Sequence, residues 1–340
     1  MKRKDINALR LKNILTKDKK ISDIYQKLKL ILSEHRKKNL FVIAVSGGPD
    51  SMALAALSKV IMNEGKYKFF FVLVDHGIRK NSFQEATQVK RLLKKHNINL
   101  DILKNKKKIY KNIQKNARDL RYDLLTKYCK EKKSKCLLVA HHQDDQIETF
   151  LMRLSRGSGV EGLSSMSQTT NLKHSIKLIR PFLDFKKGQL VYISKKVFRK
   201  TFEDPSNRNK KFLRTNIRDL RNTLQKKGLD FQRIVRSIQN ISSTKEAINF
   251  YVERSIKKYI TFKGKLTILN LEKFRQEPKE IKFKIVNKII KKTTNSYYPP
   301  RSKKVLNLID GFQRNRIKKL TLGGCIFERK NRFLFVSKEL

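Results

Sequence analysis

The sequence predicts an α/β fold whose core is a doubly wound, parallel five-stranded sheet. Two observations support this class: short runs that are apolar on both faces recur between residues 40 and 183, and each run is followed by a helix-like pattern. Strands of this kind are typical of a parallel sheet that is covered by helices on both faces. In such folds ligands bind beyond the carboxyl ends of the strands, so the loops at those ends are the first to inspect.

The elements follow one another in order along the chain. The predicted strands are 40–45, 68–74, 98–103, 136–140 and 175–183. Apolar residues at helical spacing predict helices after them, over 50–63, 82–96, 112–133, 144–155 and 188–200. The loops after the first, second and fourth strands carry SGGPDS, DHGIRK and HHQDD.

Beyond Asn209 the alternation fades. Residues 212–259 are mostly helical and basic, two more helices are predicted at 279–292 and 301–312, and 318–339 alternates like two or three short strands. We therefore expect four regions: a basic N-terminal helical extension (1–35), a catalytic α/β domain (36–210), a helical linker (211–260) and a small α+β accessory domain (261–340).

Positive charge is the strongest feature of the composition. The 340 residues include 81 Lys and Arg against 29 Asp and Glu, which gives a formal net charge of +52. A field of this sign attracts polyanions, so nucleic acid is the leading partner class. A genome biased toward lysine would give the same surplus without such a partner.

Cysteine content and hydropathy indicate the compartment. The chain has three cysteines and no CxxC pair, which fits a reducing cytoplasm. The basic N-terminal stretch lacks the apolar core of a signal peptide, and no run of about twenty apolar residues occurs. We expect a cytoplasmic protein without a membrane partner; its oligomeric state stays open, a homodimer being one option.

The turn after the first predicted strand, SGGPDS, predicts a phosphate site. Gly47 and Gly48 carry no side chains and let the backbone approach a ligand, while Ser46 and Ser51 supply hydroxyl groups. The N–H groups that open the helix at Asp50 have no partners inside it, and with the helix dipole they form an anion site. The turn is neither a Walker A loop nor GxGxxG, and a purely structural Gly-Gly turn is the alternative.

Acidic residues follow the fourth predicted strand in AHHQDDQIET, residues 140–149. Asp145 and Glu148 are three residues apart and share a helix face, where carboxylates can hold Mg²⁺ against phosphates. Capping of the helix explains these acids without a ligand. A zinc site with His141, His142 and the cysteines would require a different ligand spacing.

Two arginine-containing segments are further candidates. ARDLRY places Arg118 and Arg121 on one helix face beside Tyr122, and Arg214 and Arg218 follow EDPSN. A solvated, salt-bridged face is the alternative for the first pair, and a turn that enters a basic helix is the alternative for the second.

Together these motifs resemble one family. SGGxDS resembles the PP-loop of the ATP pyrophosphatases, which cleave ATP between its α- and β-phosphates. SGGPDS, VDHGIR, ARDLRY, AHHQDDQIET, RGSGVEGLSSM and EDPSN…R…R stand in the order found in bacterial tRNA(Ile)-lysidine synthetases. The resemblance covers residues 40–218 and extends more loosely to TLGGCIFERKNRFLFVSKE, which is similar to the accessory tRNA-binding domain of longer members.

The resemblance implies a ligase that uses ATP and Mg²⁺. ATP adenylates the C2 oxygen of the wobble cytidine in a tRNA(Ile) with a CAU anticodon, and the amine of free L-lysine then displaces AMP to give lysidine. The resemblance further assigns ATP to Ser46, Gly47, Gly48, Pro49, Asp50 and Ser51, and Mg²⁺ to Asp50 and Asp145. It places His141, Asp145 and Glu148 at the base and the lysine, and Arg121 and Arg214 near the phosphates or the adenylated intermediate.

Three other classes remain open. A PP-loop tRNA thiolation enzyme needs reactive or cluster-holding cysteines, whereas Cys129 and Cys136 are predicted in a helix and a strand, as core residues. A small-molecule ligase fed by an amidotransferase would need a glutaminase domain, and none is evident. A non-catalytic basic RNA-binding protein would explain the charge, but it leaves the acids beside the glycine turn without a role.

Overall fold

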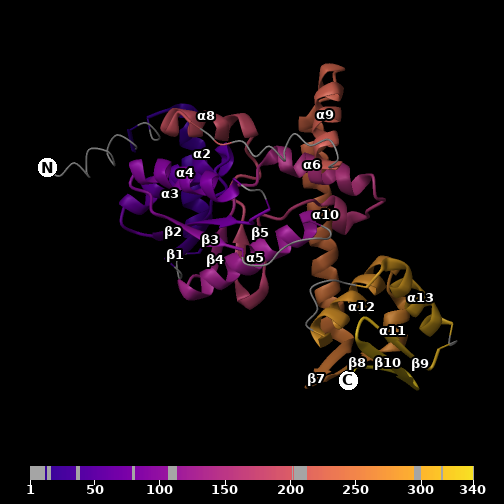
Figure 1. Ribbon diagram of the computed structural model, residues 1–340. Coiled ribbons are helices and arrows are strands. Elements are labelled where there is room, and N and C mark those ends of the chain that lie inside the picture. Colours follow the sequence, from indigo (N-terminus) through magenta and orange to yellow (C-terminus); the bar gives the residue numbers. More distant parts are fainter. Residues whose placement is uncertain are drawn as a thin grey trace. The chain divides into compact units, whose positions relative to one another are not determined.

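The computed structural model describes residues 12–13, 17–35, 39–78, 81–105, 113–200, 202, 213–294, 300–314 and 317–339 (Figure 1). The chain divides into two compact units, Met1–Gln239 and Asn240–Leu340. The boundary lies inside the range 211–260 that the sequence assigned to a linker, within one long helix, α10 (Phe231–Tyr259). No helix in the described part of the chain combines the length and the apolar character needed to cross a membrane.

A mostly parallel sheet forms the centre of the first unit, in the order β3-β2-β1-β4-β6-β5. The five predicted strands are confirmed as parallel neighbours: β1 (Leu40–Ala44), β2 (Lys68–Asp75), β3 (Leu100–Lys104), β4 (Cys136–Leu138) and β6 (Lys177–Ile179). A sixth strand, β5 (Thr169–Asn171), pairs antiparallel with β6 at the edge and was not predicted. Its sequence, Thr-Thr-Asn, has no apolar residue and is largely exposed, so it gave no strand signal.

Helices cover both faces of this sheet, as the doubly wound fold requires. The helices of the first unit are α2 (Lys19–Ser33), α3 (Pro49–Asn63), α4 (Ser82–Lys95), α5 (Ile113–Glu131), α6 (Gln143–Leu154), α7 (Val160–Leu163), α8 (Lys187–Phe198) and α9 (Leu213–Lys226). Alternate strand residues point to opposite faces. Phe41 and Ile43 share a core with α2, α3, α4 and α8, whereas Val42 packs with α5 residues such as Leu125 and Cys129.

Helix α2 belongs to the core of the α/β unit, although the sequence placed residues 1–35 in a separate extension. Its apolar residues recur at helical spacing, and Ile21, Ile24 and Leu28 are fully buried in the same cluster as α3 and α8. Lys196 and Tyr192 of α8 both donate hydrogen bonds to the Asp18 carboxylate, which also caps α2. These contacts attach α2 to the α/β unit.

The second unit has its own sheet and its own core. Five antiparallel strands run in the order β7-β8-β11-β10-β9, with bounds Ile260–Lys263, Leu266–Asn270, Phe333–Lys338, Cys325–Lys330 and Lys319–Leu322. Three helices pack with them: α11 (Leu271–Gln276), α12 (Lys279–Thr294) and α13 (Ser302–Gln313). The predicted small α+β domain is confirmed in class, while the β7–β8 hairpin was not predicted.

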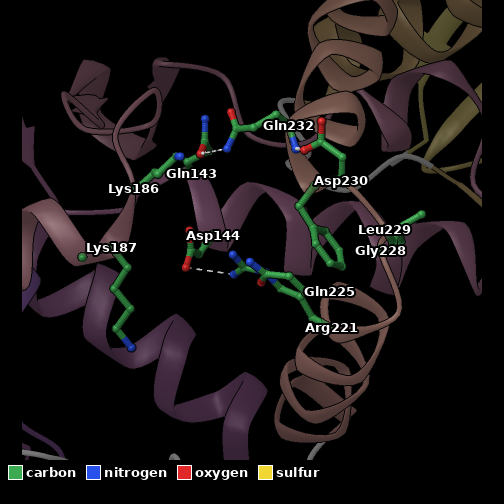
Figure 2. A pocket seen from close by; sticks show the side chains of 12 residues that line it. Gln143, Asp144, Lys186, Lys187, Arg221, Gln225, Gly228, Leu229, Asp230 and Gln232 are labelled. Atoms are coloured by element: carbon green, nitrogen blue, oxygen red, sulfur yellow. Dashed lines mark hydrogen bonds and ion pairs between the residues drawn. The ribbon is translucent and has the colours of Figure 1, made fainter.

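A cavity of about 510 Å³ lies in the first unit, where the start of α6 meets the start of α8 and the turn from α9 into α10 (Figure 2). Its walls carry both signs of charge, including Asp144, Lys187 and Asp230. Gln143 and Gln232 close one side with a hydrogen bond of 3.2 Å. Arg221 lies over the Phe231 ring, 5.2 Å from its centroid.

Candidate active site

The order of the strands brings the motif loops together. Strands β2, β1 and β4 are neighbours and run parallel, so the loops that follow them leave the same edge of the sheet. These loops begin near Val45, His76 and Val139 and carry three of the predicted motifs. In open α/β sheets this edge is where ligands bind.

The glycine turn is built around the Ser51 hydroxyl. Its Oγ accepts a hydrogen bond from the Ser46 N–H at 3.0 Å and donates to the Gly48 carbonyl at 3.0 Å. Gly47 has φ +87°, and a Cβ built on it would lie 2.7 Å from the Val89 Cγ2 atom. Gly48 precedes α3 and has no side chain to cap it, so the helix opens with backbone N–H groups directed at the turn.

His142 connects the glycine turn to α6. Its Nε2 atom lies 3.6 Å from Asp50 Oδ2 and 3.5 Å from Asp145 Oδ2. It also begins α6 through a reciprocal cap: its N–H donates to Asp145 Oδ2 at 3.1 Å, and its Nδ1 accepts from the Asp145 N–H at 3.4 Å. Burial alone would lower the pKa of His142, but the hydrogen bond to Asp50 and the nearby carboxylates raise it above its ordinary value.

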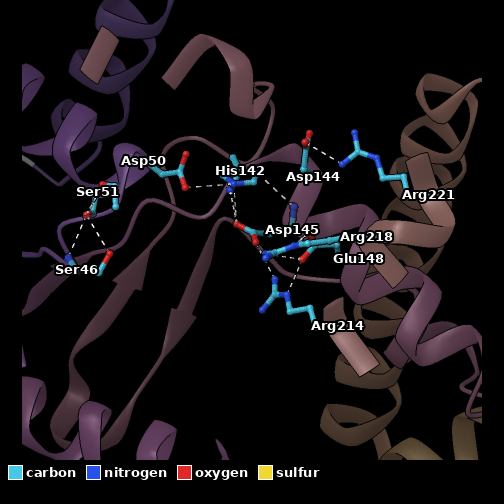
Figure 3. Close-up of polar contacts among 11 residues, drawn as sticks. Ser46, Asp50, Ser51, His142, Asp144, Asp145, Glu148, Arg214, Arg218 and Arg221 are labelled. Atoms are coloured by element: carbon cyan, nitrogen blue, oxygen red, sulfur yellow. Dashed lines mark hydrogen bonds and ion pairs between the residues drawn. The ribbon is translucent and has the colours of Figure 1, made fainter. Parts of the chain in front are cut away.

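Two arginines of α9 hold the predicted acids of α6 (Figure 3). Arg214 bridges them, with Nη2 at 2.7 Å from Asp145 Oδ1 and Nε at 2.6 Å from Glu148 Oε2. Arg218 adds a second contact to Glu148, from Nε to Oε1 at 2.5 Å. Burial works to raise the pKa of Glu148, which is 2% exposed, but these two guanidinium groups bring the pKa below its ordinary value.

Asp144, the neighbour of Asp145, takes part in a different contact. Its carboxylate pairs with Arg221 of α9, Nη1 to Oδ2 at 2.8 Å, and both residues line the cavity of Figure 2. The consecutive acids that open α6 therefore have separate surroundings: Asp145 joins the Asp50–His142 network, and Asp144 forms part of the cavity wall.

His141 lies near arginines whose charges disfavour its protonated form. Burial lowers its pKa well below the ordinary value, and the positive charges of nearby arginines lower it further; these are Arg180, Arg121, Arg118 and Arg214. Its Nδ1 atom is buried without a hydrogen-bond partner among the described residues. The guanidinium groups of Arg118 and Arg121 lie 5.1 Å and 5.3 Å from the centroid of the Tyr122 ring.

The oxygen donors can be tested against Mg²⁺. Asp50 Oδ1 is buried and has no hydrogen-bond partner among the described residues, so it has a lone pair to offer. Both oxygens of Asp145 already accept hydrogen bonds, from Arg214 and from the His142 N–H. No group of three or more metal-ligating side chains occurs in the part of the chain that the structure describes. Asp50 therefore fits a magnesium ion that takes its remaining ligands from phosphates and water, and Asp145 fits it less well.

The structure places most of the predicted site residues in one network. Asp145, Glu148 and Arg214 are in direct contact and Asp50 joins them through His142, while Arg121 acts on this region, among the described residues, through its charge on His141. The sequence named Arg218 as a candidate beside Arg214 and His142 in the zinc alternative, but it assigned neither of them a role in the site. His142 stands at a helix start, three residues before an acid. This spacing is typical of a capping box and would have identified His142 as a capping residue. The EDPSN segment (203–207) and Arg79 lie outside the described residues.

Comparisons with known proteins identify the family of the chain. The PP-loop domain family matches residues 17–224. The tRNA(Ile)-lysidine synthase of Wolbachia pipientis wMel is 32% identical over 306 residues, which cover 88% of this chain and 71% of that protein. The enzyme of the same name from Rickettsia typhi is 31% identical, covering 87% of this chain and 69% of the relative.

A solved structure supports the fold. The U34-tRNA thiolase NcsA from Methanococcus maripaludis, with its [4Fe-4S] cluster, superposes with a TM-score of 0.55 at 18% identity. The match covers 66% of this chain and 79% of the thiolase, and at this identity it speaks for the shared fold alone. The glycine turn is joined to the acids of α6, and the two synthases that are 32% and 31% identical match most of the chain. The chain therefore belongs to the tRNA(Ile)-lysidine synthase family of PP-loop proteins.

Proposed function

We propose that this protein joins free L-lysine to C2 of the wobble cytidine in a tRNA(Ile) with a CAU anticodon. ATP first adenylates the C2 oxygen and releases pyrophosphate; the lysine amine then attacks C2 and AMP leaves, giving lysidine. The observation that carries the proposal is the linkage of the glycine turn, through Asp50 and His142, to Asp145 and Glu148. An anion site and an ammonium site thus lie next to each other.

The turn at 46–51 has the features of the ATP subsite. Its backbone N–H groups and the start of α3 favour the negative charge that develops on pyrophosphate. Asp50 would hold Mg²⁺ through its free oxygen, and the ion, when bound, offsets phosphate charge. Arg214 and Arg121 are the guanidinium groups that we assign to the phosphates and to the adenylated base.

The lysine subsite needs both negative charge and a proton acceptor. Asp145 and Glu148 supply two carboxylates for an ammonium group. The attacking amine must be neutral, so its proton needs a base. Burial and the charges of nearby arginines lower the pKa of His141 and make it a weak base. We therefore assign its Nδ1 atom, which has no partner among the described residues, to a hydrogen bond with the substrate and not to the uptake of this proton.

The net charge of the whole chain supports tRNA as the partner. A formal charge of +52 favours a nucleic acid partner, and a single-stranded anticodon loop can present an unstacked base to a site on the sheet edge. The three cysteines form no disulfide among the described residues, which supports our assignment of the protein to the reducing cytoplasm.

The state of the cysteines disfavours thiolation. Sulfur transfer requires a reactive thiolate. Cys129 and Cys136 are fully buried in α5 and β4, and burial raises the pKa of Cys129 to about 12. Cys325 is buried in the second unit. All three cysteines are packed as core residues, as the sequence predicted for Cys129 and Cys136.

Nucleoside mass spectrometry tests the proposal. We expect a lysine adduct on cytidine after incubation with ATP, Mg²⁺, L-lysine and the CAU-anticodon transcript. Asp50→Ala and Asp145→Ala should lose the product while they retain tRNA binding, and Asp144→Asn serves as the matched control that keeps it. A thiolated uridine in place of the adduct would contradict the proposal, and normal turnover by both alanine variants would contradict the site assignment.

A further inference from the structure

The carboxylates assigned to lysine are already paired with arginine side chains. Glu148 accepts three N–H bonds: one from Arg214 Nε at 2.6 Å, and two from Arg218, Nε at 2.5 Å and Nη2 at 3.2 Å. Asp145 Oδ1 accepts from Arg214 Nη2 at 2.7 Å. A lysine ammonium that binds these acids therefore competes with two guanidinium groups.

The charges of this cluster balance. In the ion pairs of Asp145 and Glu148, two carboxylates face two guanidinium groups, so an added ammonium gives these pairs one surplus positive charge beside the deeply buried Glu148. Such a charge is strongly disfavoured away from water. An added phosphate has the opposite effect, because it offers a guanidinium a second bidentate partner of negative charge.

The two sides of the cluster differ in their freedom to move. The side chains of Asp145 and Glu148 are 12% and 3% exposed and are fixed on α6, whereas those of Arg214 and Arg218 are 37% and 31% exposed. The long, partly solvated arginines are thus the groups that can turn to a new partner. Arg214 contacts both acids, so its departure frees Asp145 Oδ1 and leaves Glu148 Oε2 with the 3.2 Å bond from Arg218 Nη2 alone.

We propose that Arg214 and Arg218 couple nucleotide binding to lysine binding, and that Arg218 is the positioning residue of this coupling. Phosphate draws Arg214 away from Asp145 and Glu148, which then accept the ammonium group. Arg218 stays on Glu148, keeps that buried carboxylate paired and orients it toward lysine. This inference rests on the proposed function, and it sets an order in which lysine binds tightly only after nucleotide.

Arg221 provides a matched control on the same helix. It lies one turn beyond Arg218 and also pairs with an acid of α6, Nη1 to Asp144 Oδ2 at 2.8 Å. That pair belongs to the cavity wall and has no contact with Glu148 among the described residues. Arg221→Gln thus removes the same charge from α9 without opening the lysine subsite.

Equilibrium dialysis of radiolabelled L-lysine against the full chain measures the coupling. With Mg²⁺ present, we expect an α,β-methylene analogue of ATP to tighten lysine binding by about tenfold, and lysine to tighten analogue binding by the same factor. Arg218→Gln removes the group that orients Glu148 toward lysine, so lysine binding in the presence of the analogue should weaken and the coupling should fall to about threefold or less. Arg221→Gln should keep the wild-type coupling.

A second variant keeps the test valid if Arg218→Gln does not fold. Arg218→Lys retains the charge but, as a point charge, loses the bidentate contact, so its coupling should also fall while thermal unfolding stays close to that of the wild type. Independent binding of the two ligands to the wild type would overturn the inference, as would equal loss of coupling in Arg221→Gln. Neither result touches the proposed function, which fails only if no lysine adduct forms on the tRNA.

Discussion

Gly47 and Gly48 are adjacent but differ in the side chain they tolerate. Gly47 has a left-handed backbone, and a Cβ there would meet the buried Val89, whereas the nearest neighbour of a Cβ on Gly48 is Ser46 Oγ at 3.5 Å. We predict that Gly47→Ala lowers the free energy of unfolding by about 1–3 kcal/mol. Gly48→Ala is the matched control and should change it by less than about 1 kcal/mol. Urea unfolding measures both, and equal effects would contradict the left-handed requirement.

Glu148 makes stability depend on pH at the acid end. Its folded pKa lies below the ordinary value because the arginine contacts outweigh burial. The stabilisation is therefore complete above the unfolded pKa of about 4.3 and is lost as the pH falls through the lower folded pKa. We predict that the difference in unfolding free energy between the wild type and Glu148→Gln is constant near neutral pH and shrinks below about pH 4. A difference that stays constant down to about pH 2 would refute this assignment.

Individual site residues were predictable where the signal is local. Ser46 to Ser51, Asp145 and Glu148 could be named as candidates because a glycine turn, a helix start and a three-residue spacing are readable along the chain. The contacts of His142 and Arg218 could not be predicted, because their partners are set by folding: His142 meets Asp50 from another strand, and Arg218 reaches Glu148 across 70 residues.

Helix α9 is attached to α6 largely by ion pairs. Ile217 is buried, but Leu213 and Leu220 are 42% and 51% exposed, while three arginines pair with acids of α6. Partly exposed pairs are weakened by salt, whereas apolar packing is not. We predict that amide hydrogen exchange in α9 becomes about fivefold faster from low to high NaCl. This change corresponds to a loss of about 1 kcal/mol in the free energy of opening of α9.

Exchange in α3 is the internal reference for that measurement. Most of its residues are fully buried in the apolar core, so its exchange should not respond to NaCl. A salt response of equal size in both helices would show that the ion pairs do not hold α9.

The parallel strands and their helices were predictable because each carries an apolar run. The β5 strand was not, because the sequence Thr-Thr-Asn becomes a strand only through its partner β6 and the hydrogen bond from Arg180 Nη1 to Thr170 Oγ1, at 2.8 Å. Similarly, α2 was recognisable as a helix, but its membership of the α/β core depends on contacts with α8 that the linear sequence does not contain.

At the scale of the whole molecule, net charge governs the encounter with tRNA. A protein that neutralises about six to ten phosphates loses roughly 10³- to 10⁵-fold in affinity between about 50 mM and about 200 mM salt. With a formal charge of +52, we predict a fall in this range for the CAU-anticodon transcript, measured by filter binding. An affinity that does not change with salt would contradict binding of the tRNA phosphates by the basic surface.

The burial of all three cysteines has a practical consequence. Because burial raises the pKa of Cys129 to about 12 and that of Cys325 to about 11, and Cys136 is fully enclosed, the native chain offers maleimide reagents almost no thiolate at neutral pH. A cysteine engineered onto the surface of each unit can therefore be labelled with a dye without first replacing the native ones. A donor dye on one unit and an acceptor dye on the other would allow single-molecule energy transfer to measure the distance between the two units with and without tRNA.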